Sequence, residues 1–234
     1  MRLQMQDFAA RGGQALFLGT EYASVAYKMY AAFGFASIEA ASGYMAYYGK
    51  SQAEFEQSYF APSSDPTDVL IQPLQWMHWP LSAALFLGDF PGIVRAVRMQ
   101  IFGRQSSEGG LLDLLLESEK REQQGKQSTT AILQKRVTRA VVGLATYTRD
   151  PLWPDTYLAD IYCHPAYWEQ APALLEALLM PTNQRVVAYV DADHDAKIAA
   201  LTAAGFQSVT RLPNWLAADE ASNRRVDVLV MVRA

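Results

Sequence analysis

Short blocks of apolar residues, separated by polar turns, predict a mixture of strands and helices along the chain. Residues 15–18 form a continuous apolar run, as in a strand buried on both faces of a sheet. Between residues 21 and 33 the apolar positions recur at helical spacing, which predicts an amphipathic helix. By the same criteria we expect further strands at 44–48, 69–71, 129–134, 141–148, 156–163, 185–190, 207–212 and 226–232, and further helices at 51–60, 76–87, 93–102, 111–124, 172–179 and 196–204.

One pattern of elements occurs twice. The first copy contains Ala15-Leu-Phe-Leu-Gly-Thr20, a helix, and Gly34-Phe35. The second contains Val186-Val-Ala-Tyr-Val190, a helix, and Gly205-Phe206. Each copy reads as an apolar strand, a polar turn, a helix, Gly-Phe and a further strand. A repeat of this length indicates one supersecondary unit that is used twice.

A stretch of proline and serine without a hydrophobic run divides the chain. It reads Ala61-Pro-Ser-Ser-Asp-Pro-Thr67, a composition typical of a linker. We therefore expect a first unit at residues 1–60, a linker at 61–67 and a larger domain at 68–234.

Composition and charge exclude several classes of partner. The 234 residues are 50% hydrophobic and 19% charged, as in ordinary globular domains. The net charge of −4 gives no field that would attract nucleic acid. The single cysteine, Cys163, excludes an internal disulfide and fits a reducing compartment. Because no apolar run approaches the roughly 20 residues of a membrane helix and the start lacks a signal peptide, we expect a cytoplasmic protein with neither nucleic acid nor a membrane as partner.

Three motifs in the larger region carry a family resemblance. Val142-Gly-Leu-Ala145, Tyr157-Leu-Ala-Asp-Ile-Tyr-Cys-His-Pro165 and the helix end at 201–206 resemble the third strand, fourth strand and fourth helix of the Gcn5-related N-acetyltransferases, or GNATs. The resemblance covers residues 69–234 as a whole domain and residues 1–48 as the C-terminal half of a second one. It implies a mixed α/β GNAT acyl-CoA N-acyltransferase fold, with a central, mostly antiparallel sheet flanked by helices. It also implies a tandem arrangement with a half-GNAT first unit, truncated because Met1 falls inside an expected helix.

The resemblance implies a place for acetyl-CoA as co-substrate. In the family this molecule lies in a wedge where the fourth and fifth strands separate, which would give the backbones of Ile161, Tyr162 and Cys163 to the pantetheine arm. The pyrophosphate would rest on the following helix start, where Trp168, Ala171 and Ala173 occupy positions of the family loop R/Q-x-x-G-x-G/A.

The chain departs from that loop at several positions. Trp168 replaces Arg or Gln, Ala171 replaces the first glycine, Pro172 lacks an N–H, and Glu169 adds negative charge. Each change costs about 1 kcal/mol or more of anion binding, judged from hydrogen bonds to charged groups. We expect weakened acetyl-CoA binding, or none. The alternative reading is an ordinary helix start with proline in its first turn.

Two residues stand where the resemblance implies catalytic groups. Tyr30, four residues before Gly34, matches a tyrosine that protonates the departing thiolate, whereas the second copy has Leu201 there. Asp160 lies in the fourth strand, near the general base of family members. The structural alternatives are a core aromatic for Tyr30, and for Asp160 a strand residue that faces solvent or an arginine.

Other polar clusters carry weaker signals. Cys163 and His164 are adjacent, so in a strand they point to opposite faces and do not pair. The run 191–195, Asp-Ala-Asp-His-Asp, lacks the glycine and glutamate of a calcium loop and reads better as a helix N-cap. His78 lies on a helix that borders the acceptor site in the family, where it either lines that site or packs in the core. We expect no metal.

Two functions of different classes follow. The first is a GNAT acyltransferase that moves acetyl from acetyl-CoA to the amine of a small molecule or peptide. The second is a catalytically inactive GNAT-fold scaffold or ligand-binding protein. In either case the strand at 15–18 presents an apolar edge, which we expect the chain's own second domain or a partner subunit, as in a homodimer, to cover.

Overall fold

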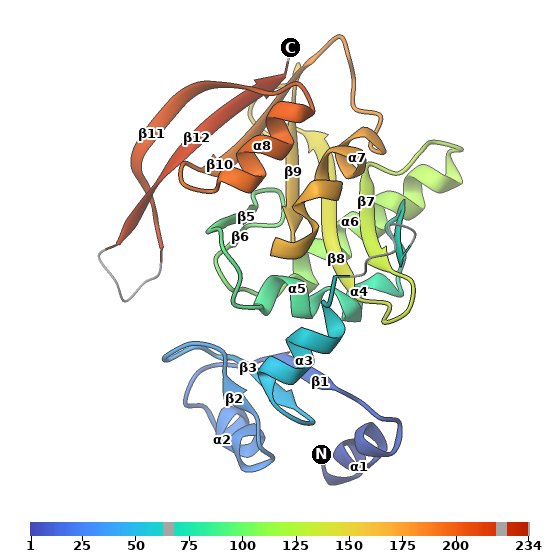
Figure 1. Ribbon diagram of the computed structural model, residues 1–234, viewed down its shortest axis with the longest axis vertical. Helices are drawn as coiled ribbons and strands as arrows, with labels where there is room; N and C mark the ends of the chain where they lie inside the picture. The colour runs from blue at the N-terminus through green and yellow to red at the C-terminus, as the bar shows by residue number, and fades with distance from the viewer. Residues whose placement is uncertain (63–67, 219–223, 234) are drawn as a thin grey trace. The chain divides into compact units, whose positions relative to one another are not determined.

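The computed structural model describes residues 1–62, 68–218 and 224–233, which form two compact units, Met1–Ala61 and Pro62–Ala234 (Figure 1). Most of the linker expected at 61–67 lies outside the described residues.

The smaller unit holds a three-stranded sheet with the strand order β1-β3-β2. Its elements are α1 (Arg2–Ala10), β1 (Ala15–Gly19), α2 (Val25–Ala32), β2 (Ala36–Ser37), β3 (Tyr44–Tyr48) and α3 (Gln52–Tyr59). Helix α2 begins later than expected because the Ser24 side chain caps it by accepting a hydrogen bond from the Tyr27 amide. A capping box between Ser51 and Glu54 starts α3.

The larger unit is built on a seven-stranded sheet with the order β11-β12-β10-β9-β8-β7-β4. The strands are β4 (Val69–Pro73), β7 (Thr130–Lys135), β8 (Val141–Arg149), β9 (Thr156–Cys163), β10 (Arg185–Asp191), β11 (Gln207–Ala217) and β12 (Arg225–Arg233). All neighbours pair antiparallel except β9 and β10, which are parallel. This mixed sheet confirms the predicted fold class.

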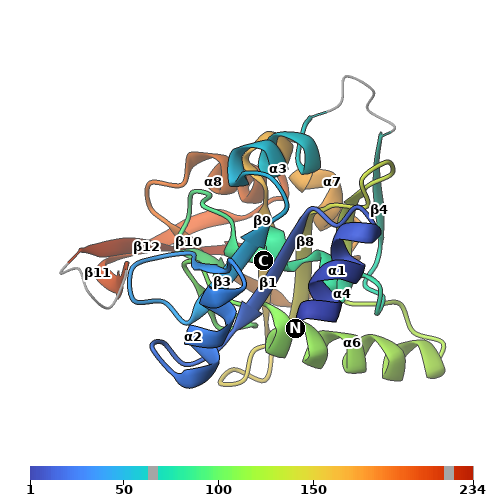
Figure 2. The same ribbon diagram turned by 90° about the horizontal axis from the view of Figure 1, so that it is seen from below.

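Helices cover both faces of this sheet (Figure 2). One face carries α4 (His78–Leu81), α5 (Ala83–Leu87) and α6 (Glu108–Gln123); the other carries the 3₁₀ helix η2 (Pro165–Gln170), α7 (Ala171–Glu176) and α8 (Asp195–Ala203). The main core lies on the α6 side and contains Leu74, Leu85, Phe86, Ala96, Met99, Ile101, Leu111, Leu114, Leu115, Ile132, Val141, Leu144 and Tyr162.

The sequence repeat corresponds to a repeated topology. Strand β1, helix α2 and the pair β2 and β3 follow the same order as β10, α8 and the pair β11 and β12, and in each sheet the last strand lies between the other two. Gly34 and Gly205 have φ of 91° and 88°, a region that only glycine adopts without strain. In both copies the next residue, Phe35 or Phe206, donates its amide to the carbonyl five residues earlier, which closes a Schellman-type helix end.

The prediction of a helix at residues 93–102 was wrong. The segment forms a small hairpin of β5 (Val94–Ala96) and β6 (Ile101–Phe102). Its amides are hydrogen-bonded to carboxylates from two other strands, so they do not form a helical ladder. Tertiary contacts thus override a pattern that read as amphipathic.

Candidate functional site

The site lies where β9 and β10 separate. Their parallel pairing ends at Leu158 and Val187, although β9 stays paired with β8 on its other edge as far as Cys163. The part of β9 from residue 159 to residue 163 therefore has no strand on its β10 side. This opening, which we call the wedge, is where the resemblance placed acetyl-CoA, and Asp160, Ile161, Tyr162 and Cys163 all belong to it.

Residues 91–98, which we call the strap, lie in the wedge. Figure 1 shows the β5–β6 hairpin beside β9, and β5 contacts both β9 and β10. The Asp160 carboxylate accepts hydrogen bonds from the Val97 amide at 2.9 Å and the Arg98 amide at 2.7 Å. From the other strand, the Asp191 carboxylate accepts from the amides of Ile93, at 2.7 Å, and Val94, at 3.1 Å. Two carboxylates thus hold four amides of one segment, as two adjacent pairs separated by two residues.

A lysine closes the wedge from the helix side. Lys197, near the start of α8, donates from Nζ to the Val94 carbonyl at 2.8 Å. Lys197, Asp160 and Asp191 are each only 1% exposed. Lys197 therefore reaches the strap inside the wedge.

An arginine fastens the base of the strap. The Arg95 guanidinium donates to the carbonyls of Phe86 (2.6 Å), Gly88, Phe90 (2.7 Å) and Gly92, and it lies 5.0 Å from the centre of the Tyr162 ring. Arg95 is 1% exposed. Four carbonyl acceptors and an aromatic face compensate for the burial of its charge.

Burial and opposite charges act against each other in this cluster. Burial raises the pKa of Asp160, and Lys197 together with the amides of Arg98 and Val97 opposes the rise. Burial lowers the pKa of Lys197, and the carboxylates of Asp160 and Asp191 oppose that fall. Asp160 and Lys197 therefore depend on each other to stay charged.

The expected pyrophosphate loop is wound into helices, and two of its positions have no free amide. Helix η2 runs directly into α7, so the Ala171 amide is already bonded to the Trp168 carbonyl, and Pro172 has no N–H to offer. Ala171 is fully buried, Ala173 is exposed, and the exposed Glu169 adds negative charge nearby. Trp168 packs its ring 4.9 Å from that of His194 and 6.3 Å from that of Tyr162. The loop thus lacks free amides at residues 171 and 172, and the strap occupies the wedge.

The two predicted catalytic residues lie in different units. Tyr30 is half-buried on α2, with its ring 5.8 Å from that of Phe35. Asp160 faces the strap with both oxygens bonded, so action as a general base would require the strap to leave. Leu201, at the position of the family tyrosine in the second copy, is fully buried.

The remaining sequence candidates have structural partners. His78 is fully buried, accepts from the Gln75 amide at Nδ1 and contacts the Gln72 side chain at Nε2. Cys163 is buried and unpaired, and burial raises the pKa of its thiol. His194 caps α8 by accepting from the Lys197 amide. Among the described residues, no three His, Cys, Asp or Glu side chains converge as metal ligands, and none of the helices has the length and apolar character needed to cross a bilayer.

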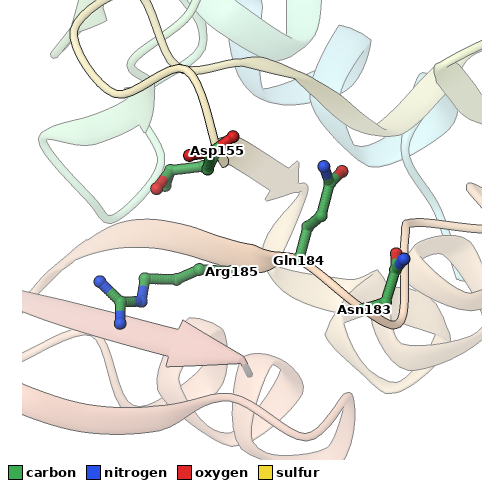
Figure 3. Close-up of a pocket in the computed structure, with 5 residues that line it drawn as sticks. Asp155, Asn183, Gln184 and Arg185 are labelled. Atoms are coloured by element: carbon green, nitrogen blue, oxygen red, sulfur yellow. The ribbon is translucent and has the colours of Figure 1, made fainter.

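A polar cavity of about 410 Å³ lies at the other end of the same strands. Asp155, Thr156, Asn183, Gln184 and Arg185 line it, at the starts of β9 and β10 (Figure 3). Because the strands are parallel, this cavity is separated from the wedge by the paired part of the sheet. None of the residues that line it was a catalytic or cofactor-binding candidate in the sequence analysis.

Sequence reasoning missed the groups that define the wedge. Asp191 was read as a helix cap, and Arg95 and Lys197 were not singled out. Lys197 did carry a signal, because it stands on the apolar side of its helix together with Ala200 and Leu201, and all three are buried. A lysine at such a position indicates a buried partner.

Comparisons of sequence and of structure give different results. No family model matches the chain, and no curated protein matches it in sequence. Solved structures do match. Phosphinothricin acetyltransferase of the GNAT superfamily from Sinorhizobium meliloti, in complex with acetyl-CoA, has a TM-score of 0.50 at 15% identity over 71% of this chain and 88% of its own. Ribosomal-protein-S5-alanine acetyltransferase from Vibrio fischeri has a TM-score of 0.50 at 11% identity over 74% and 96%. The sheet order, the splayed parallel pair and these matches show that the chain has the GNAT acyl-CoA N-acyltransferase fold.

Proposed function

We propose that the Pro62–Ala234 unit is a catalytically inactive GNAT-fold scaffold, and that residues 1–60 are the C-terminal half of a second copy of this fold. One observation carries the first part: the wedge is filled by the strap and by Lys197. The repeated strand order and the matching Gly-Phe helix ends support the second part.

The filled wedge argues against acetyl-CoA binding on energetic grounds. A pantetheine arm would have to displace the strap, which would leave Asp160, Asp191 and Lys197 without their hydrogen-bond partners. Loss of a partner for a buried charge costs several kcal/mol. The bonded Ala171 amide and Pro172 leave too few donors for the pyrophosphate to offset that cost.

Thermal unfolding of the full chain with acetyl-CoA tests the proposal. A ligand at about 100 times its dissociation constant stabilises a protein by roughly 2.7 kcal/mol, which shifts the melting temperature by several degrees. All five tryptophans lie in the larger unit, so their fluorescence follows the unfolding of that unit. We expect no shift at about 1 mM acetyl-CoA. A rise of several degrees in the tryptophan transition would overturn the proposal.

The second candidate function is acetyl transfer from acetyl-CoA to the amine of a small molecule or peptide, with Tyr30 as general acid in the smaller unit. It is favoured by the position of Tyr30 on α2, four residues before the helix-ending Gly34. Under this candidate, the full chain acetylates amines and Tyr30→Phe loses most of the turnover. Tyr27→Phe, on the same helix, is the matched control. Absence of acetyl transfer to a panel of amines and peptides would remove this candidate.

A further inference from the structure

The strap binds in the wedge through its main chain. Four of its amides donate to the carboxylates of Asp160 and Asp191, and its Val94 carbonyl accepts from Lys197. We infer that the wedge is a groove for a peptide main chain that is extended at residues 94–96 and turns at residues 97–98, and that the chain fills it with residues 91–98 of its own. This inference rests on the proposed function and deepens it, because it names the occupant of the site.

The partners of the strap come from three separate elements. Asp160 belongs to β9, Asp191 ends β10, and Lys197 lies in α8. All three are 1% exposed, so water does not compete for these hydrogen bonds. Hydrogen bonds between amides and ionised groups are about twice as strong as neutral ones. The wedge thus recognises a peptide main chain by charge-assisted bonds.

The number of donors distinguishes a peptide from a pantetheine arm. The two carboxylates accept from four amides within six residues, of which Ile93 and Val94 form one adjacent pair and Val97 and Arg98 the other. A pantetheine arm carries fewer N–H groups and would leave carboxylate oxygens buried without donors.

Side chains fix the register of the strap. Val94 and Ala96 are buried, and Arg95 between them is held by four carbonyls. Gly92, the second residue of the strap, has φ of 98°, and a Cβ there would lie 2.6 Å from His194 Cδ2. A glycine therefore lets the strap enter the wedge directly beneath His194.

Amide hydrogen exchange of the full chain, resolved by residue, tests the inference. In the wild type we expect the amides of Ile93, Val94, Val97 and Arg98 to exchange as slowly as those of β9. Asp160→Asn should accelerate Val97 and Arg98 by about tenfold or more, and Asp191→Asn should do the same for Ile93 and Val94. Asp227→Asn is the matched control, because Asp227 of β12 also accepts a main-chain amide, from Asn214, but through a solvent-exposed hydrogen bond.

The outcomes separate the inference from the proposed function. Strap amides that exchange at the rate of an unprotected chain, or variants that accelerate all four amides equally, would overturn the inference. If either variant fails to fold, trypsin on the wild type decides: we expect no cleavage after Arg95 or Arg98 in the folded protein, and cleavage there overturns the inference. Acetyl-CoA binding with the strap amides still protected would overturn only the proposed function.

Discussion

Replacement of Lys197 by methionine tests the charge balance of the wedge. Methionine is similar in size and lacks the ammonium group. It removes the 2.8 Å hydrogen bond to the Val94 carbonyl. It also removes the buried positive charge that interacts with the carboxylates of Asp160 and Asp191. The strap then loses one of its anchors, and both carboxylates stay buried.

The expected loss follows from these contacts. A hydrogen bond from a charged donor contributes about 1.5–3 kcal/mol. Removal of one partner from a buried ionic group costs about 3–5 kcal/mol. Because methionine avoids the desolvation of the ammonium group, we expect the net loss to lie near the lower end, at about 3 kcal/mol. Against a typical stability of about 5–15 kcal/mol, this change is large.

Urea unfolding followed by tryptophan fluorescence measures the loss. Lys120→Met, on the exposed face of α6, is the matched control and should stay within about 0.5 kcal/mol of the wild type. The double variant Lys197→Met with Asp160→Asn should cost less than the sum of the two single variants, since it leaves no carboxylate at position 160 that lacks a counter-charge. If the unfolding free energy of Lys197→Met lies within about 0.5 kcal/mol of that of the wild type, the role of Lys197 in balancing the buried carboxylates is refuted.

Three further predictions concern other parts of the chain. Gly92→Ala should destabilise the larger unit by about 1–2 kcal/mol, because alanine is strained at φ of 98° and its Cβ collides with His194; an unchanged urea midpoint would contradict this. Burial lowers the pKa of His164 to about 4, so the unfolded chain binds more protons below about 6.5, and stability should fall as the pH drops from 6.5 towards 4. His164→Gln should therefore lose less stability than the wild type between pH 7 and pH 5, and an equal loss would show that His164 does not contribute. Strand β1 is an edge strand of its sheet, and we predict that a second copy covers it, so analytical ultracentrifugation should find a dimer and a monomer would count against it.

The order of elements was predictable because local pattern and fold agree. Strands β7, β8 and β9 read as apolar runs bounded by turns, and they fold within one or two residues of the expected limits. Gly34 and Gly205 predicted two helix ends, and the structure confirms both through the positive φ of these glycines. In these places the residue types alone determine the conformation.

The strap was not predictable, for a physical reason. Its conformation depends on Asp160 and Asp191, which lie about 60 and 100 residues further along the chain, so no local window contains the cause. The 3₁₀ helix η2 escaped notice similarly, because Pro165 reads as the end of a strand and not as the start of a helix. The degenerate loop, by contrast, was visible in Ala171 and Pro172. The sequence thus indicated that acetyl-CoA binding was in doubt, but not what takes its place.

The most direct test is amide hydrogen exchange of the strap with and without about 1 mM acetyl-CoA, a concentration at the upper end of typical KM values. We predict slow exchange of the Ile93, Val94, Val97 and Arg98 amides, and we expect acetyl-CoA to leave it unchanged. Faster exchange of these amides on addition of acetyl-CoA, together with new protection of residues 168–173, would show that the co-substrate displaces the strap and would contradict the proposal that the strap blocks the wedge.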